Sequence, residues 1–98
     1  MNDEKSSAAV ALVAVQPLSF ESFPAWAEQF ITVLDLQLIE REQGADYQQW
    51  LLGFEGSRVL LCFEHYGNCA WLQPFSAADQ EVAAWLTEQW NGPSVAVG

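Results

Sequence analysis

Apolar residues recur at three- and four-residue spacing in two parts of the chain, which predicts two amphipathic helices. The first follows Ser22, a suitable N-cap, and has Pro24 in its first turn, where a missing N–H costs little. Its buried side is expected to contain Phe23, Trp26, Ala27, Phe30, Ile31 and Leu34. The second follows Ser76, with Asp79 at the capping-box position, and stops at Asn91-Gly92-Pro93. Its buried side is expected to contain Ala78, Val82, Trp85, Leu86 and Trp90.

Five apolar runs of other periodicity predict β-strands. The first, Ala8–Val15, is too continuous to alternate, which indicates a strand that is covered on both faces or placed centrally. The other four are Leu36–Glu42, Tyr47–Phe54, Arg58–Glu64 and Cys69–Gln73. Turns are expected at Gly44–Asp46, at Glu55-Gly56 and at His65–Asn68, where Gly67 can adopt a positive φ.

The predicted order, β-α-β-β-β-β-α, favours an α+β two-layer sandwich. Two helices would lie on one face of a mostly antiparallel sheet of about five strands. The first helix would make the first two strands parallel, through a right-handed connection, if they are neighbours or near neighbours in the sheet. The place of the first strand in the sheet stays open. We expect a single domain over residues 7–92, a disordered N-terminus over 1–6 and a flexible tail over 93–98.

Counting through the turns assigns each strand residue to one face of the sheet. A loop of two or four residues at Glu55-Gly56 sets Leu52 opposite Val59 and Trp50 opposite Leu61. The face under the helices would then contain Ile39, Trp50, Leu52, Phe54, Val59, Leu61, Phe63, Ala70 and Leu72. The other face would contain Leu38, Leu51, Leu60, Cys62 and Trp71, with Glu40, Glu42, Gln49, Arg58 and Glu64 around them.

This second face is more apolar than a solvated sheet face should be. A contiguous apolar patch with a polar rim predicts a binding surface for a protein partner, or for a second copy in a homodimer. Trp71 is the expected anchor, because tryptophan is enriched among binding hot spots. Two alternatives stay open. The tail at Val95–Val97 would cover the patch, or one extra loop residue would turn Trp71 into the core.

The charge of the chain narrows the classes of partner. Its 98 residues include 13 Asp and Glu against 3 Lys and Arg, a net charge of −10. Such a chain repels phosphate backbones and anionic lipid, which disfavours direct nucleic-acid and membrane binding. A second hypothesis is therefore an acidic mimic of nucleic acid that binds a basic protein. The plainer interpretation is that the charge keeps a small bacterial domain soluble.

The hydrophobic runs do not predict a membrane protein. No run approaches the roughly 20 apolar residues that span a bilayer. Ala8–Val15 is short, follows Asp3, Glu4 and a single Lys5, and lacks a clear signal-peptide pattern. We therefore expect a cytoplasmic protein.

Reactive side chains gather at one place only, in Cys62, Glu64, His65 and Cys69. A third hypothesis is an enzyme or metal protein that uses this cluster. Zinc sites usually need four closely spaced ligands, and the chain has no second cysteine or histidine pair. Cys69 and His65 would approach each other across the turn, as nucleophilic catalysis requires, but packed cysteines and a solvated histidine explain the same residues. We expect no cofactor, and an interaction module rather than an enzyme.

The run "GADYQQWLLGFEGSRVLLCFEHYGNCAWLQP" resembles the central part of a small proteobacterial family known as domain of unknown function 3630. A Gly-Ala-Asp turn, a Trp-Leu strand, Phe-Glu-Gly-Ser and a Tyr-containing turn before Trp-Leu follow in the same order. The matching residues are Gly44, Asp46, Trp50, Phe54, Glu55, Gly56, Tyr66, Trp71 and Leu72. The likeness spans most of the chain. It implies a compact bacterial domain and assigns no catalytic role.

Overall fold

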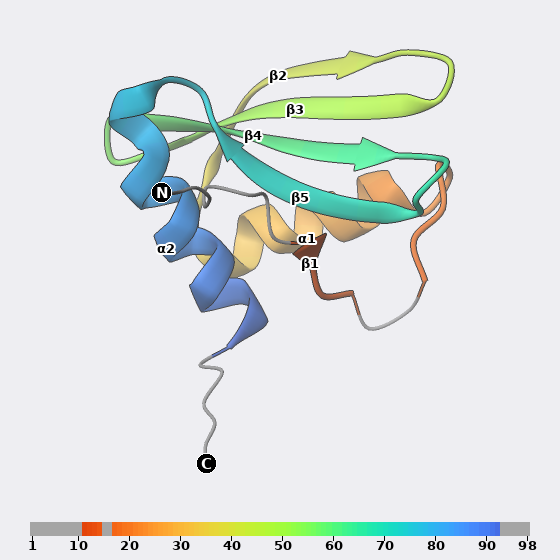
Figure 1. Ribbon diagram of the computed structural model, residues 1–98, viewed down its shortest axis with the longest axis horizontal. Helices are drawn as coiled ribbons and strands as arrows, with labels where there is room; N and C mark the ends of the chain where they lie inside the picture. The colour runs from red at the N-terminus through yellow and green to blue at the C-terminus, as the bar shows by residue number, and fades with distance from the viewer. Residues whose placement is uncertain (1–10, 15–16, 93–98) are drawn as a thin grey trace, which may run out of the picture.

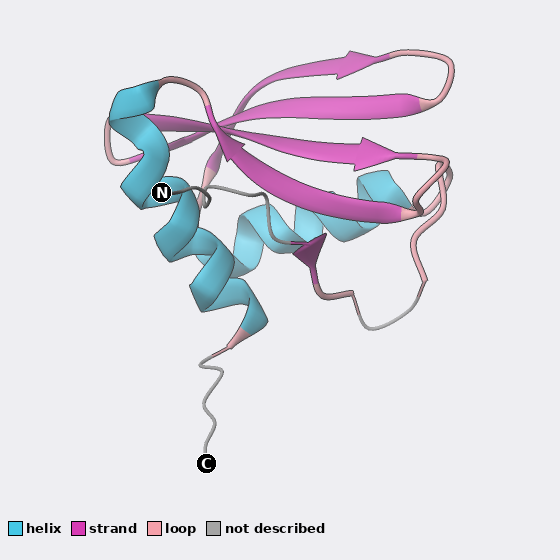
Figure 2. Ribbon diagram, viewed as in Figure 1, coloured by secondary structure: helices cyan, strands magenta, loops and turns pink. Residues whose placement is uncertain are grey.

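Two helices lie on one face of a five-stranded antiparallel sheet (Figure 1). This is seen in a computed structural model that describes residues 11–14 and 17–92. The strands are β1 (Ala11–Leu12), β2 (Gln37–Gln43), β3 (Tyr47–Phe54), β4 (Ser57–Glu64) and β5 (Cys69–Pro74). The helices are α1 (Phe23–Leu34) and α2 (Gln80–Asn91), with the 3-10 helix η2 (Ala77–Asp79) before α2. Figure 2 shows the two layers, which confirm the predicted α+β fold.

The sheet has the order β1-β5-β4-β3-β2, so the first and last strands of the chain are neighbours. β1 pairs antiparallel with β5, with Ala11 opposite Trp71. The prediction of a centrally placed strand over Ala8–Val15 is therefore wrong, since β1 lies at an edge. β1 and β2 run in the same direction but occupy opposite edges, so α1 connects the two edges of the sheet. Residues 8–10 and 15, like the predicted terminal segments 1–6 and 93–98, lie outside the described residues.

The end of α2 holds the segment that follows β1. The Val13 N–H donates to Asn91 Oδ1 at 2.8 Å, and Trp90 Nε1–H donates to the Val13 carbonyl at 2.6 Å. The side chain of Leu12 is buried in the core. In this segment Leu12 therefore packs into the core at the edge of the sheet, whereas the side chain of Val13 is exposed.

The core lies between the sheet and the helices and is built around aromatic rings. Phe23 of α1 stacks on Phe63 of β4 at 5.2 Å and meets Trp50 of β3 edge-on at 5.7 Å, both between ring centroids. Phe30 contacts Trp90 of α2, with centroids 4.9 Å apart, which joins the two helices. The largest fully buried side chains are Trp50, Phe23, Phe30, Phe63, Leu52, Leu61, Leu86 and Val59.

The start of the second helical segment matches the predicted capping box. Asp79 Oδ2 accepts hydrogen bonds from the Ser76 N–H at 3.2 Å and the Ser76 hydroxyl at 2.9 Å. Asp79 Oδ1 also accepts from the Arg58 N–H at 3.3 Å, which ties η2 to β4. The buried side of α2 differs from the prediction, because the helix turns Ala83 and Leu86, three residues apart, toward the core. Ala78 and Trp85 are exposed and Ala83 is buried, while Leu86 is buried as expected.

Candidate interaction surface on the open sheet face

The turns set the register that divides the sheet residues between two faces. Glu55 and Gly56 have φ values of 49° and 87°, the two positive values that a type I′ hairpin turn requires. The turn pairs Phe54 with Ser57, and Leu51 then lies opposite Leu60. In the next hairpin the residue with positive φ is Asn68 (51°), not the predicted Gly67.

Four of the five residues predicted for the second face lie on it. Leu51 pairs with Leu60, and Cys62 pairs with Trp71, all on the face opposite the buried Leu61. Trp71 does not turn into the core. Both helices lie against the other face (Figure 1). We call the face with Leu51, Leu60, Cys62 and Trp71 the open face. Whether residues 95–97 cover it lies outside the described residues.

Leu38 is the predicted residue that the structure places elsewhere. A β-bulge shifts the β2–β3 register between Leu38 and Glu40, so Leu38 lies opposite Leu52, on the helix face. Ile39, predicted for the core, lies over Gly53 on the open face: a Cβ at Gly53 would be 3.2 Å from Ile39 Cδ1. Ile39 is 48% exposed. The bulge thus exchanges two apolar side chains, because one extra residue reverses the alternation.

Ile39 therefore joins the apolar residues of the open face. We call this set the apolar stripe: Ile39, Leu51, Leu60, Cys62 and Trp71. Leu51, Leu60 and Trp71 are each partly buried by their neighbours. Cys62 is only 5% exposed, because it lies between its register partners Gln49 and Trp71. The stripe crosses β2, β3, β4 and β5.

The two ends of the open face carry different charges. At the end where β3 begins and β4 stops, Tyr47 lies opposite Glu64, and its hydroxyl donates to Glu42 Oε2 at 3.2 Å. This hydrogen bond, together with the negative charge of Glu42, raises the pKa of Tyr47. At the other end Arg58 lies opposite Gly53, with its guanidinium 5.7 Å from the centre of the Phe75 ring.

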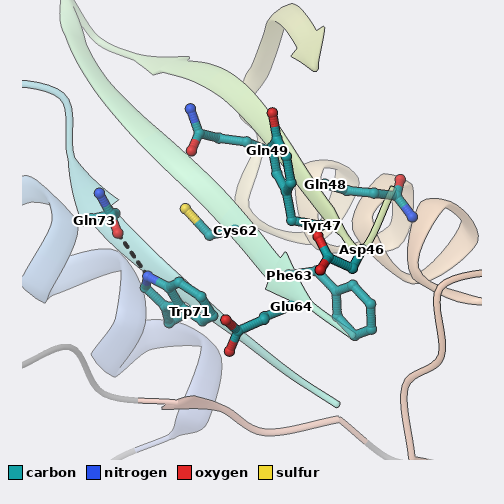
Figure 3. A pocket seen from close by; sticks show the side chains of 9 residues that line it. All are labelled: Asp46, Tyr47, Gln48, Gln49, Cys62, Phe63, Glu64, Trp71 and Gln73. Atoms are coloured by element: carbon teal, nitrogen blue, oxygen red, sulfur yellow. Dashed lines mark hydrogen bonds between the residues drawn. The ribbon is translucent and has the colours of Figure 1, made fainter. Parts of the chain in front are cut away.

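A shallow hollow of about 290 Å³ opens at the acidic end of the open face (Figure 3). Cys62 lies between Trp71 on one side and Gln49 with Tyr47 on the other. Trp71 Nε1–H donates to Gln73 Oε1 at 2.8 Å, which holds the indole in place. The lining residues are Asp46, Tyr47, Gln48, Gln49, Cys62, Phe63, Glu64, Trp71 and Gln73.

The sequence prediction found the Cys62 and Trp71 part of this hollow and missed Asp46, Tyr47 and Gln73. Tyr47 could have been predicted by counting from the turn at Glu55-Gly56, because the register that pairs Leu51 with Leu60 also pairs Tyr47 with Glu64. The Trp71–Gln73 hydrogen bond joins residues two apart on one strand, which point to the same face.

The reactive cluster is only partly assembled. Burial raises the pKa of the Cys62 thiol to about 12, which keeps it protonated and poorly nucleophilic at neutral pH. Cys69 lies opposite Glu64 at the end of the hairpin. His65 is exposed in the turn, with its ring 5.9 Å from that of Tyr66. Within residues 11–14 and 17–92 no three Cys, His, Asp or Glu side chains are grouped as metal ligands would be.

A family model described as "Protein of unknown function (DUF3630)" matches residues 1–91 of the chain. The chain belongs to this family. No curated protein and no solved structure matches it. In the described part of this DUF3630 domain, no helix is long and apolar enough to span a bilayer.

The residues that carry the family resemblance have clear structural roles in this DUF3630 domain. Glu55 and Gly56 form the type I′ turn, and Trp50 and Leu72 are buried in the core. Gly44 lies under the ring of Tyr47, where a Cβ would overlap that ring. Two matching residues, Trp71 on the open face and the exposed Tyr66, contribute little to the core.

Proposed function

We propose that this DUF3630 domain is a protein–protein interaction module that binds its partner through the open face. The observation that carries the proposal is the apolar stripe, which crosses four strands on the face opposite both helices. Covering such a stripe removes apolar surface from water, which is the main favourable term in protein association. The cytoplasmic location expected from the sequence stays a prediction.

The stripe is also preorganised for binding. Its central residues are held by register pairs, and the Trp71 indole is fixed by its hydrogen bond to Gln73. A side chain that is already ordered loses less conformational entropy when a partner arrives. The polar side chains around the stripe, among them Gln49, Arg58 and Glu64, suit the rim of an interface.

A partner protein is favoured over a second copy of the chain. Two copies that meet through this face would bring Glu40, Glu42 and Glu64 of both chains into one interface, with a net charge of −10 on each chain. Like charges across an interface are unfavourable. Light scattering at two salt concentrations tests this choice. A monomer supports a separate partner, and a salt-insensitive dimer that Leu60→Gln dissociates shows that the face binds itself.

Site-specific photo-crosslinking in the cells that make the protein tests the proposal. The photoreactive residue replaces Leu60 on the open face or, as a control, Val33 on α1, which is 60% exposed. We expect one adduct of defined mass from position 60 and not from position 33. With that partner purified, Leu60→Gln should weaken binding by about tenfold or more, while Val33→Gln leaves it unchanged. Equal adducts from both positions, or an unchanged affinity of Leu60→Gln, would exclude the open face.

Charge supports a second candidate, an acidic mimic that binds a basic, nucleic-acid-handling protein. Arg41 lies 4.5 Å from the centre of the Trp50 ring and pairs with Glu28 at 3.4 Å, so its charge is partly used within the domain. Most carboxylates of the chain therefore have no cation to balance them, given the net charge of −10. Binding of this kind should weaken steeply as salt rises, whereas binding through the apolar stripe, which involves few charges, should weaken much less.

A further inference from the structure

We propose that the hollow on the open face receives an arginine or lysine side chain from the partner protein. This inference rests on the proposed function and specifies the chemistry of the partner. The hollow combines an apolar floor with carboxylates at its edge: Cys62 and Trp71 line it together with Asp46 and Glu64 (Figure 3). A long basic side chain has the matching form, an apolar stem with a cation at its tip.

The aromatic groups in the lining favour a cation as well. Trp71 presents an indole whose orientation is fixed by Gln73, and Tyr47 stands on the other side of Cys62. A guanidinium or ammonium group is attracted to an aromatic ring, and most strongly to tryptophan. The amide oxygen of Gln49, which also lines the hollow, is a further acceptor for the donors of such a group.

The domain does not supply this cation itself from its described residues. Arg41 lies on the helix face against Trp50 and Glu28, and Arg58 lies at the far end of β4 over Phe75. His65, next to Glu64 in the chain, packs its ring against Tyr66 instead. Asp46 and Glu64 therefore face the hollow without a cationic partner among residues 11–14 and 17–92.

The negative charge extends beyond the two carboxylates of the lining. Glu42 lies beside the hollow, where its carboxylate accepts the hydrogen bond of Tyr47. A basic residue entering from outside would relieve the repulsion among these groups and would be steered toward them by their combined field. A second copy of this chain is a poor source of that residue, since the chain has 3 Lys and Arg in total.

The test uses a capped Leu-Arg-Leu tripeptide and its citrulline counterpart, which has nearly the same shape without the charge. Both are titrated at millimolar concentrations into the labelled whole chain, and amide and indole N–H signals are followed by NMR. We expect the arginine peptide to shift the Trp71 indole signal and the amides of Gln49 and Glu64, and the citrulline peptide to bind more weakly. Glu64→Gln should weaken the arginine peptide about two- to fivefold.

A matched control separates the hollow from general attraction to an acidic protein. Glu88→Gln removes the same charge from an exposed position on α2 and should leave the affinity unchanged. Equal shifts with citrulline, equal losses in the two variants, or no shift at all would overturn the inference. A Trp71 indole signal that moves on dilution without peptide would show a second copy in the hollow and would overturn it too. The peptide results do not affect the crosslinking test at Leu60. The proposal of a basic side chain in the hollow can therefore be wrong while the open face is still the partner surface.

Discussion

The two faces of the sheet are built from the same strands, and both have apolar centres. Leu60 and Leu61 are neighbours in β4, yet Leu61 is 0% exposed under the helices whereas Leu60 is partly exposed on the open face. The difference comes from what packs on each face. Aromatic rings of α1 and α2 fill the space above one face, and the other bears the apolar stripe. Apolar composition alone therefore does not mark a core.

The strongest test of this comparison shortens each of the two leucines. Leu61→Ala should lower the free energy of unfolding by about 2–5 kcal/mol, because it leaves a cavity in a closed core. Leu60→Ala should cost about 1 kcal/mol or less, since its side chain is already in contact with water. Urea denaturation of the two variants measures both values. Equal losses would mean that the open face is packed as tightly as the core.

The division between the faces could be predicted well where the turns are regular. Counting from Glu55-Gly56 placed Trp50 opposite Leu61, and the structure confirms it. The same counting failed in β2, because the β-bulge between Leu38 and Glu40 depends on how the strand twists at the sheet edge. No single residue type in that stretch signals a bulge. Leu38 and Ile39 are both large and apolar, so the pattern looks the same in either register.

The hollow was only half predictable for a related reason. Trp71 and Cys62 could be predicted because they are apolar residues at strand positions that the register assigns to the face opposite the helices. Tyr47 opposite Glu64 follows from the β3–β4 register, but Asp46 was interpreted only as a turn residue, and its place in the lining depends on how the ends of two hairpins lie together in three dimensions. The backbone N–H of His65 donates to the Asp46 carbonyl at 2.9 Å, which continues the β3–β4 pairing one position beyond Tyr47 and Glu64 and links the two turns.

A second test loosens the helix layer from the sheet. Asp79→Ala removes the capping box and the acceptor of the Arg58 N–H, so the free energy of unfolding should fall by about 1–2 kcal/mol. Asp79→Asn keeps one acceptor oxygen and should lose less. Thermal denaturation followed by circular dichroism ranks the three proteins. An Asp79→Ala variant as stable as the wild type would show that the helix layer does not depend on this anchor.

A third test acts on the turn that sets the register of both faces. Gly56→Ala places a side chain at a φ of 87° and should cost about 1 kcal/mol. Gly67→Ala is the control, because its Cβ would only meet Cys69 Sγ at an ordinary contact distance of 3.4 Å. Denaturant midpoints of the two variants give the comparison. If the control costs as much as Gly56→Ala, turn strain is not what holds the register.

The smallest expected effect on stability at neutral pH concerns Cys62, which lies on the open face but is as buried as a core residue. Its thiol pKa is raised from the ordinary 9.0 to about 12, so it stays protonated while the unfolded chain begins to lose that proton. Because the folded state binds the proton more tightly, its contribution to stability is present below pH 9 and is lost as pH rises toward 12. Urea denaturation at a series of pH values should therefore show stability falling across this window, and the fall should be smaller in Cys62→Ala than in a Cys69→Ala control.

Alkylation of the native protein gives an independent measure of the same burial. At neutral pH an alkylating reagent should modify Cys69, which is partly exposed, well before Cys62. Peptide mass spectrometry after a short exposure identifies which thiol has reacted. Rapid modification of Cys62 would mean that Gln49 and Trp71 separate readily and that the hollow is a mobile surface. Protection of Cys62 would instead show that the floor of the hollow on the open face is ordered. Binding of a partner through the apolar stripe and binding of a basic side chain in the hollow both depend on that order.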